Sequence, residues 1–332
     1  MSAQVFVAKE CAAGELRVAA TPETVKRYVK DGLSITVQAG AGSGANIADS
    51  AYQEAGATIA TDAKAAWGSA DLVLKVSPPQ QNAELGADES TLFKPGAILI
   101  SHVFPHKQLA AVKTLGERKV STLAMDLIPR ISRAQVMDSL SSQANIAGYK
   151  AVVLAASRLG KYFPLLMTAA GTIQPAKVVI MGAGVAGLQA IATARRLGAM
   201  VEVSDIRPAV KEQVESLGGK FIELPMQESG EGQGGYAKEV SADFLAKQQA
   251  VLKQRISQAD VVITTAQVPG RPAPRLVTED MVKAMRQGSV IVDIAADSGG
   301  NCELTENNRE GEEQGVVNLG KANWPNTMPE DA

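Results

Sequence analysis

Short apolar runs alternate with longer amphipathic stretches along most of the chain, which predicts alternating strands and helices. In the first half, helical patterns such as residues 22–30 and 107–115 separate the apolar runs. The expected strands there are residues 5–8, 34–39, 71–76, 97–103 and 122–126. In the second half they are residues 177–181, 200–204, 220–224, 259–265 and 289–295. Such alternation is typical of parallel, doubly wound sheets.

A helical pattern over residues 132–159 connects the two halves, with Gly148 as the candidate point of interruption. We therefore predict an α/β fold of two doubly wound parallel-sheet (Rossmann-like) lobes joined by a long helix. The expected N-terminal lobe is residues 1–130, the connecting helix is residues 131–160, and the second lobe is residues 161–320. Residues 321–332 are expected to return to the first lobe.

The turn at residues 182–187 carries the most specific chemistry. It reads GAGVAG, which fits G-x-G-x-x-G, and it lies between an expected strand and an expected helix; the following strand ends on Asp205. Gly182 permits the tight turn, Gly184 lets backbone N–H groups approach a pyrophosphate, and Gly187 lets the helix pack closely on the sheet. The diphosphate would then lie at the positive end of the helix. Together these features predict a dinucleotide site.

Asp205 sets the expected choice between NAD(H) and NADP(H). Its carboxylate can accept hydrogen bonds from both hydroxyls of an adenosine ribose and would repel a 2′-phosphate, so we predict NAD(H). Arg207 could pair with a 2′-phosphate, although a solvated charge before Pro208 is the favoured interpretation. A second glycine-rich loop, residues 40–44, has the spacing GxGxG and no following strand that ends on an acid. It favours a plain turn, and hence one nucleotide site per chain.

Composition narrows the class of protein. The chain has 332 residues, a formal net charge of −2 and 4% aromatic residues. This length suits two domains, each with its own core. Balanced charge and few aromatic residues give no indication of a nucleic-acid partner. Cys11 and Cys302 lie far apart and the only histidines are His102 and His106, so we expect neither a metal site nor a disulfide framework.

Targeting signals are also missing from the sequence. The N-terminal residues lack the basic region and apolar core of a secretory signal, which predicts a reducing, cytosol-side location. No uninterrupted apolar run of about 18 residues occurs, so we expect no direct membrane insertion. Docking on a membrane protein remains compatible with this pattern.

Two segments each allow two interpretations from their residues alone. Residues 229–236, SGEGQGGY, are too rich in glycine for regular structure. They fit two interpretations equally: a flexible connector, or a lid with Tyr236 at its tip. Ser132 and Gln135 form an S-x-x-Q capping box. Gln135, Asp138 and Ser141, however, step by three residues and so project from nearby faces of a helix, as the residues of a binding site would.

The segment at residues 129–149 resembles the signature of the NAD(H)-binding domain I of proton-translocating nicotinamide nucleotide transhydrogenase. It reads PRISRAQ at residues 129–135 and continues through Asp138 to SSQANIAGY at residues 141–149. Further matching motifs are LRVA and TP at residues 16–19 and 21–22, the glycines of residues 182–187, GGYAK at 234–238, PGRPAP at 269–274 and GGNC at 299–302. The similarity covers essentially the whole chain. Relatives continue for some tens of residues past Pro325, usually with a helix that returns to the first lobe, and a lobe without that helix would expose apolar surface.

The resemblance implies an activity and partners. In that family the domain is a homodimer of two-lobed subunits, which exchanges hydride with the NADP(H)-binding domain of a partner polypeptide. Membrane-spanning components couple this exchange to proton translocation. The expectation is therefore that NAD(H) binds here and NADP(H) binds on the partner. The chain would be cytoplasmic, peripheral to the inner membrane on its cytoplasmic face, and active only with its partner subunits.

The resemblance also assigns residues to the site. Around the nicotinamide and its ribose it implies Arg130, Gln135, Asp138 and Ser141, with Ser132 still a cap. The adenosine half would be held by Gly182, Ala183, Gly184, Val185, Gly187, Asp205, Ile206 and Arg207. Gly235 and Tyr236 would lie on a mobile loop, and Ala266 and Gln267 would approach the nicotinamide ribose largely through backbone. The family usually has an apolar residue where Gln267 stands.

Two alternatives stay open. Alanine dehydrogenase shares the expected fold but must move protons at an amino acid centre with a lysine and a histidine. Lys75 and Arg17 match its lysine and its carboxylate-binding arginine, yet Phe104 stands where its histidine aligns and His102 is two residues early. Direct hydride exchange between two nicotinamides needs no acid or base, which fits the small number of histidines in the sequence. The other alternative is a non-catalytic NAD-binding regulatory subunit, which the sequence does not distinguish from an incomplete enzyme.

Overall fold

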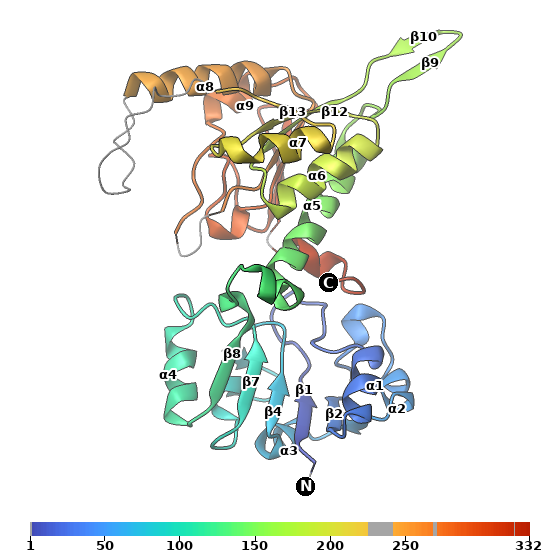
Figure 1. Ribbon diagram of the computed structural model, residues 1–332, viewed down its shortest axis with the longest axis vertical. Helices are drawn as coiled ribbons and strands as arrows, with labels where there is room; N and C mark the ends of the chain where they lie inside the picture. The colour runs from blue at the N-terminus through green and yellow to red at the C-terminus, as the bar shows by residue number, and fades with distance from the viewer. Residues whose placement is uncertain (1, 225–241, 268–270, 322) are drawn as a thin grey trace. The chain divides into compact units, whose positions relative to one another are not determined.

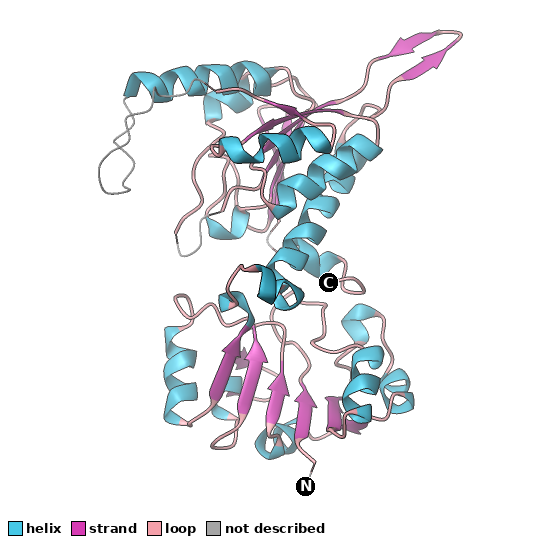
Figure 2. Cartoon of the chain, in the orientation of Figure 1, coloured by secondary structure: helices cyan, strands magenta, loops and turns pink. Residues whose placement is uncertain are grey.

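The computed structural model describes residues 2–224, 242–267, 271–321 and 323–332. The chain divides into two compact units: unit 1 comprises Met1–Gln143 and Pro325–Ala332, and unit 2 comprises Ala144–Trp324. Each is built on a central sheet with helices against it (Figures 1 and 2). The predicted α/β class with parallel, Rossmann-like sheets is confirmed. None of the described helices combines the length and apolar character that crossing a bilayer requires.

Unit 1 contains a six-stranded sheet with the order β3-β2-β1-β4-β7-β8, in which all neighbours are parallel. Its strands are β1 Gln4–Val7, β2 Ser34–Gln38, β3 Thr58–Ala60, β4 Leu72–Leu74, β7 Ile98–Ser101 and β8 Ser121–Ala124. The order reverses at β1, which is the doubly wound pattern, and ligands of such sheets bind outside the carboxyl ends of the strands. A short antiparallel pair, β5 (Gln81–Asn82) and β6 (Ala87–Asp88), follows β4.

Alternation along β1 distributes its side chains between two cores. Val5 and Val7 pack with residues of α1 (Pro22–Lys30) and α2 (Asp49–Glu54). Phe6 faces the other way, and its ring lies 5.7 Å from that of Trp67 on α3 (Ala63–Ser69), in a core that also includes α4 (Leu109–Glu117). The sheet is therefore covered by helices on both faces.

Unit 2 contains a seven-stranded sheet with the order β13-β12-β11-β14-β15-β17-β16. Its strands are β11 Lys177–Met181, β12 Met200–Ser204, β13 Lys220–Phe221, β14 Val261–Thr264, β15 Val290–Asp293, β16 Arg309–Glu313 and β17 Val316–Gly320. All pairs are parallel except β16 with β17. The strand order reverses at β11, which lies between β12 and β14. The expected ligand crevice is therefore at the carboxyl end of β11.

Helices cover both faces of this sheet as well. One core combines the sheet with α5 (Ser139–Arg158), α6 (Val185–Arg196) and α7 (Lys211–Ser216). The other combines it with α8 (Ala242–Ser257) and α9 (Glu279–Lys283). An antiparallel hairpin, β9 (Leu166–Thr168) and β10 (Gly171–Ile173), is separate from the large sheet and projects away from the helices of unit 2 (Figure 1).

The structure corrects the prediction for residues 132–159. Residues Ser132–Met137 form a 3₁₀ helix, and α5 begins only at Ser139, so the interruption is at Asp138 and not at Gly148. Gly148 is buried inside α5, where a Cβ would lie 2.1 Å from the carbonyl oxygen of Ala186. Glycine is needed there because the backbones of α5 and α6 approach each other closely, and not because the helix breaks.

The capping box is also wrong. The 3₁₀ helix begins after Ile131, without a capping hydrogen bond from a side chain, and neither Ser132 nor Gln135 satisfies its first backbone donors. Smaller differences concern strand ends: β8 ends at Ala124, before a 3₁₀ turn over Met125–Leu127, and β13 ends at Phe221.

The two glycine-rich loops differ in what their glycines do. In residues 40–44, a Cβ on Gly42 would lie 2.8 Å from the carbonyl oxygen of Ile47, and one on Gly44 would lie 2.6 Å from that of Leu16. This loop is a tightly packed turn. In the second loop, Gly182 has a φ of +107°, and a Cβ on Gly187 would lie 1.9 Å from the carbonyl oxygen of Gly182. That contact brings α6 against the end of β11.

We expect Gly187→Ala to lower the free energy of unfolding by about 1 to 3 kcal/mol or more, since the added carbon must displace backbone. Gly184→Ala is the matched control, because its Cβ would meet no atom within 4 Å and its φ is −78°. The control should stay within about 1 kcal/mol of the unmodified protein. Urea titration of both variants checks this, and equal losses would contradict the packing role of Gly187.

Candidate functional site

The turn after β11 is held from both neighbouring strands in unit 2. On the β12 side, Gly182 N–H donates to the Ser204 carbonyl at 2.8 Å, and Ala183 N–H donates to Asp205 Oδ2 at 2.7 Å. On the β14 side, Thr265 Oγ1 donates to the Gly182 carbonyl at 3.1 Å. The turn is therefore fixed at the point where the strand order reverses, which is where ligands bind in this architecture. Thr265 was not predicted, because its contact depends on the pairing of β11 with β14.

The glycines have the roles that a dinucleotide turn requires. Gly182 adopts the left-handed backbone, and Gly187 allows α6 to pack on the turn. The space around Gly184 is open, since a Cβ there would meet no atom within 4 Å. Gly184 precedes α6, whose first turn carries Val185 and presents unpaired N–H groups and the positive end of the helix dipole. Such a helix end is suited to an anion.

Asp205 is nearly buried and fully engaged by hydrogen bonds. Oδ2 accepts from Ala183 N–H at 2.7 Å and from Arg207 Nη2 at 2.9 Å. Oδ1 accepts from the backbone N–H of Arg207 at 2.8 Å and from its Nε at 2.9 Å. Burial alone would raise the pKa of Asp205, but the hydrogen bonds from Arg207 and Ala183 outweigh it and hold the pKa below its usual value. The carboxylate is therefore anionic at neutral pH.

Arg207 is not simply a solvated charge, and its guanidinium is already engaged rather than available to bind a 2′-phosphate. Its guanidinium forms a bidentate pair with Asp205, while its side chain remains 56% exposed. A carboxylate offers about four lone-pair positions, and here Ala183 and Arg207 use four. A ribose that binds Asp205 must therefore replace contacts of Arg207. Ile206, between these two residues, exposes its apolar side chain.

The backbone of Ala266, after β14, is bonded to the amide of Asn301. Ala266 N–H donates to Asn301 Oδ1 at 3.0 Å, and Asn301 Nδ2 donates to the Ala266 carbonyl at 2.9 Å. Asn301 is buried and also donates to the Pro274 carbonyl at 2.8 Å. Asn301 therefore fixes both ends of the loop that follows β14. Gln267 is exposed, with Nε2 3.3 Å from Asp297 Oδ1. Gly235 and Tyr236 lie outside the described residues.

The four residues assigned to the nicotinamide lie in unit 1, and two of them contact each other. Ser141 N–H donates to Asp138 Oδ1 at 2.9 Å, and Ser141 Oγ donates to Asp138 Oδ2 at 2.6 Å. Asp138 thus caps α5. These bonds from Ser141, together with the charge of Arg130, lower the pKa of Asp138. Arg130 and Gln135 are exposed, and the Gln135 side chain makes no hydrogen bond within the described part of the chain.

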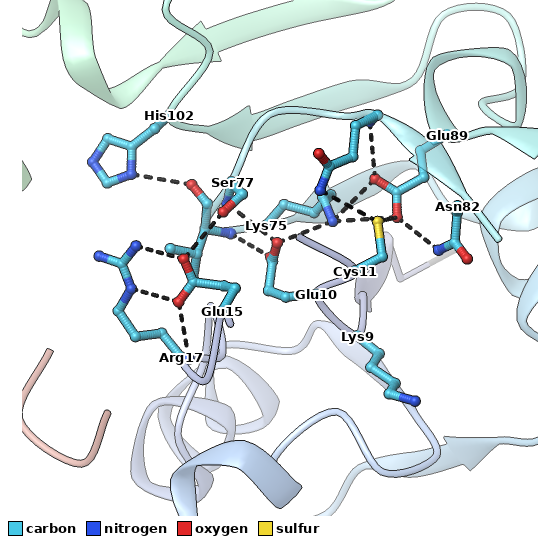
Figure 3. Close-up of polar contacts among 12 residues, drawn as sticks. Lys9, Glu10, Cys11, Glu15, Arg17, Lys75, Ser77, Asn82, Glu89 and His102 are labelled. Carbon is cyan, nitrogen blue, oxygen red and sulfur yellow. Dashed lines mark hydrogen bonds and ion pairs between the residues drawn. The ribbon is translucent and has the colours of Figure 1, made fainter. Parts of the chain in front are cut away.

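Unit 1 also holds a buried polar cluster at the carboxyl ends of its central strands, and Figure 3 shows its members in close-up. Lys75 Nζ lies 3.2 Å from Glu10 Oε2 and 3.1 Å from Glu89 Oε2, and all three side chains are buried. Glu89 also accepts from Asn82 at 3.0 Å. Burial raises the pKa of Glu10 in spite of Lys75, and it raises the pKa of the Cys11 thiol to about 11.

Arg17 is engaged in the same way. Its Nε and Nη2 donate to Glu15 at 2.8 and 2.7 Å, and its Nη1 donates to Gln143 Oε1 at 2.7 Å. Two buried carboxylates thus surround Lys75 and a third neutralises Arg17. These two cations are the residues that the sequence comparison with alanine dehydrogenases proposes as the substrate-binding lysine and arginine. A cluster that already contains three carboxylates disfavours binding of a substrate carboxylate.

His102 does not stand free as a proton-transfer group. Its Nδ1 lies 3.0 Å from the Val76 carbonyl oxygen and its Nε2 lies 2.9 Å from Ser139 Oγ. Burial lowers the pKa of the ring, and the charge of Arg17 acts in the same direction. Phe104, which stands where the histidine of an alanine dehydrogenase would align, stacks on His102 with ring centres 5.9 Å apart.

Comparison with known proteins covers both units. Residues 6–147 match the model of the alanine dehydrogenase/PNT N-terminal domain, and residues 151–332 match that of the C-terminal domain. The chain is 50% identical over 332 residues to a chain of the NAD(P) transhydrogenase alpha subunit of Rhodospirillum rubrum, covering 99% of this chain and 86% of that protein.

Solved structures show the same two relationships. The transhydrogenase from Sinorhizobium meliloti has a TM-score of 0.88 at 45% identity, over 99% of this chain and 88% of that chain. An L-alanine dehydrogenase has a TM-score of 0.81 at 29% identity, over 99% and 85% of the two chains. The chain is similar to both groups, and more similar to the transhydrogenases.

We expect Asp138→Ala to lower the free energy of unfolding by about 0.5 to 2 kcal/mol, because α5 loses its cap. Asp138→Asn should cost only a few tenths of that, since asparagine caps helices about as well. The folded-state pKa of Asp138 is lowered, so its contribution is present above the usual pKa of aspartate and is lost as the pH falls below it. Urea titrations at neutral and acidic pH check this. Equal losses in the two variants would contradict the capping role.

Proposed function

Because the chain belongs to the alanine dehydrogenase/PNT family, we propose that it is the NAD(H)-binding subunit of a proton-translocating NAD(P) transhydrogenase. The single observation that carries the nucleotide assignment is the clamped glycine turn of unit 2, with the anionic Asp205 bonded to its Ala183 N–H. The turn supplies an open helix end for a diphosphate, and Asp205 supplies acceptors for a ribose. Ile206 offers an apolar side chain to the adenine.

The chemistry of the site requires little from the protein beyond binding. Bound NADH supplies a hydride to NADP⁺ on the partner, and this exchange consumes no proton at either ring. Arg130, Gln135, Asp138 and Ser141 are proposed to orient the nicotinamide, and Ala266 and Gln267 to approach its ribose. Asn301 would keep the Ala266 loop in place. Tyr236 is proposed to help exclude water.

Exposed apolar residues support docking of the NADP(H)-binding partner on unit 1. Val136, directly after Gln135, is 93% exposed. Large apolar side chains are exposed on both sides of it, at Leu123, Leu127, Ile131 and Met137. Several exposed apolar side chains in one segment of the chain support an interaction site there. The partner would thus cover the same segment that carries the candidate nicotinamide residues.

The hairpin of unit 2 supports a homodimer. An isolated two-stranded hairpin is only marginally stable in water. The β9–β10 hairpin exposes Leu165, Ile173 and Met167, the last at 77%. We propose that it packs on a second copy of this chain. Membrane-spanning subunits, on whose cytoplasmic face this chain would be held, would provide the proton pathway.

The alanine dehydrogenase alternative is less well supported. Lys75 and Arg17 are paired with buried carboxylates, and His102 is bonded on both nitrogens. A regulatory NAD-binding subunit without a reaction would share the nucleotide site, and only turnover with the partner separates it from the proposed function.

Nucleotide selectivity tests the nucleotide site. NADH should bind with a Kd between micromolar and millimolar and NADPH far more weakly, because Asp205 repels a 2′-phosphate. Asp205→Ala should narrow that gap. Arg207→Ala is the matched variant, since it keeps the anion and frees two of its acceptors, and it should retain or strengthen NADH binding. Isothermal titration checks these affinities, and equal affinities of the unmodified chain for NADH and NADPH would refute the role of Asp205.

Hydride transfer tests the proposed activity. Gln135→Asn should leave NADH affinity within a few-fold and slow single-turnover transfer to partner-bound NADP⁺ by about tenfold or more, since a misplacement of about 1 Å can cost roughly a hundredfold. Gln53→Asn, an exposed glutamine on α2, is the control and should react normally. A normal rate for Gln135→Asn would remove that residue from the site. NADH formation from L-alanine and NAD⁺ without a partner would support the alternative instead.

A further inference from the structure

The beginning of α5, over Ser139–Gln143, is held within unit 1 by two side-chain hydrogen bonds. His102 Nε2 lies 2.9 Å from Ser139 Oγ, and Arg17 Nη1 donates to Gln143 Oε1 at 2.7 Å. Ser139 and Gln143 are four residues apart and therefore lie on one face of the helix. At about 100° per residue, Ser141 projects from the opposite face. The two bonds therefore hold α5 on the face opposite to Ser141, and they leave the face of Ser141 accessible.

The preceding 3₁₀ helix has little packing of its own. Of its residues, only Ala134 is buried, while Gln135 and Val136 are exposed. The orientation of this segment therefore depends on the helix that follows it. Asp138 joins the two, because its carboxylate is bonded to Ser141 and its backbone N–H donates to the Gln135 carbonyl at 3.3 Å.

Arg17 is a rigid support for this helix. Two of its nitrogens form a bidentate pair with Glu15, and Glu15 Oε2 also lies 3.2 Å from Ser77 Oγ (Figure 3). Burial raises the pKa of Glu15, but the bonds from Arg17 outweigh it, and the pKa is lowered overall. The pair therefore stays ionised, and its remaining nitrogen points to Gln143. The fork geometry of the guanidinium restricts that direction.

His102 supports the helix through a defined tautomer. The Val76 carbonyl oxygen, 3.0 Å from Nδ1, can only accept, so Nδ1 carries the proton. In the neutral ring Nε2 then accepts from the Ser139 hydroxyl. A protonated ring would carry a donor at Nε2, and Ser139 would have to turn its own proton away. The charged groups that face His102 are Arg17, Asp126 and Glu15.

We propose that Arg17 and His102 are positioning residues for hydride transfer: they fix the beginning of α5 and, through Asp138, the segment that carries Gln135. The inference rests on the proposed function of the nicotinamide residues. It assigns a different task to Arg17 and His102 from the one that substrate-binding residues of an amino acid dehydrogenase would have. Both act on the nicotinamide only through α5.

Two substitutions, each of which removes one hydroxyl or one amide group, test the inference without leaving a buried charge unpaired. Ser139→Ala removes the partner of His102, and Gln143→Leu removes that of Arg17 while Glu15 still neutralises it. Each should slow single-turnover hydride transfer in the reconstituted complex by about tenfold or more and leave NADH affinity within a few-fold. Ser142→Ala is the control, because among the described residues the Ser142 hydroxyl bonds to the Ser139 carbonyl and to no side chain. It should change neither quantity, and thermal unfolding is recorded for each variant.

The pH profile separates positioning from a loss of stability. In the unmodified complex the rate should fall as the pH drops through the lowered pKa of His102, because protonation reverses the bond to Ser139 and places a positive charge near Arg17, the other support of α5. His102→Gln should remove that acid limb. Normal rates in Ser139→Ala and Gln143→Leu, or an acid limb that His102→Gln retains, would overturn the inference. An unmodified complex without any transfer would instead overturn the proposed function.

Discussion

The hydrogen bond from Ala183 N–H to Asp205 connects the two halves of the proposed nucleotide site in unit 2. Gly187 brings α6 against the Gly182 carbonyl, which fixes where the helix end begins. Asp205 then ties the turn to the end of β12 at 2.7 Å. In the proposed site, one corner of the sheet would therefore set both the diphosphate position and the ribose acceptors. Everything proposed for NAD(H) depends on this corner keeping its shape when a ribose displaces Arg207.

Unit 1 contains buried cations whose partners all belong to this chain. Lys75 and Arg17 are buried, and burial of a charge is costly unless it is paired. Glu10, Glu89 and Glu15 supply that pairing, so the charges stabilise the carboxyl edge of the sheet without standing ready for a substrate. A hydride exchange between two nicotinamides needs no proton-transfer group. The polar cluster is therefore available for holding α5.

The sequence predicts the repeating elements well and the tertiary contacts poorly. Short continuous apolar runs locate most strands of the two sheets, because side chains of a strand that is buried on both faces must be apolar in both directions. The short strand β3 was missed, since Thr58–Ala60 has too few residues to show a period. The break at Asp138 was missed because the short segment Ser132–Met137 cannot show whether its period is that of a 3₁₀ helix or of an α-helix. An aspartate three residues before Ser141 is nevertheless a capping signal. The contacts of Thr265 and of Asn301 depend on groups that are far apart in the sequence and that folding brings together. The pairing of Arg207 with Asp205 is local, because the two residues are two positions apart.

The central claim is that hydride passes between nicotinamides without an acid or base of this chain. Transfer of an isotopic label tests this claim most directly. NADH that carries deuterium at the transferred position of C4 is reacted in a single turnover with NADP⁺ on the partner, in ordinary water. Direct transfer breaks the C–D bond of the donor and forms a C–D bond on the acceptor. The account predicts full recovery of the label in NADPH, and release of the label to water would contradict it.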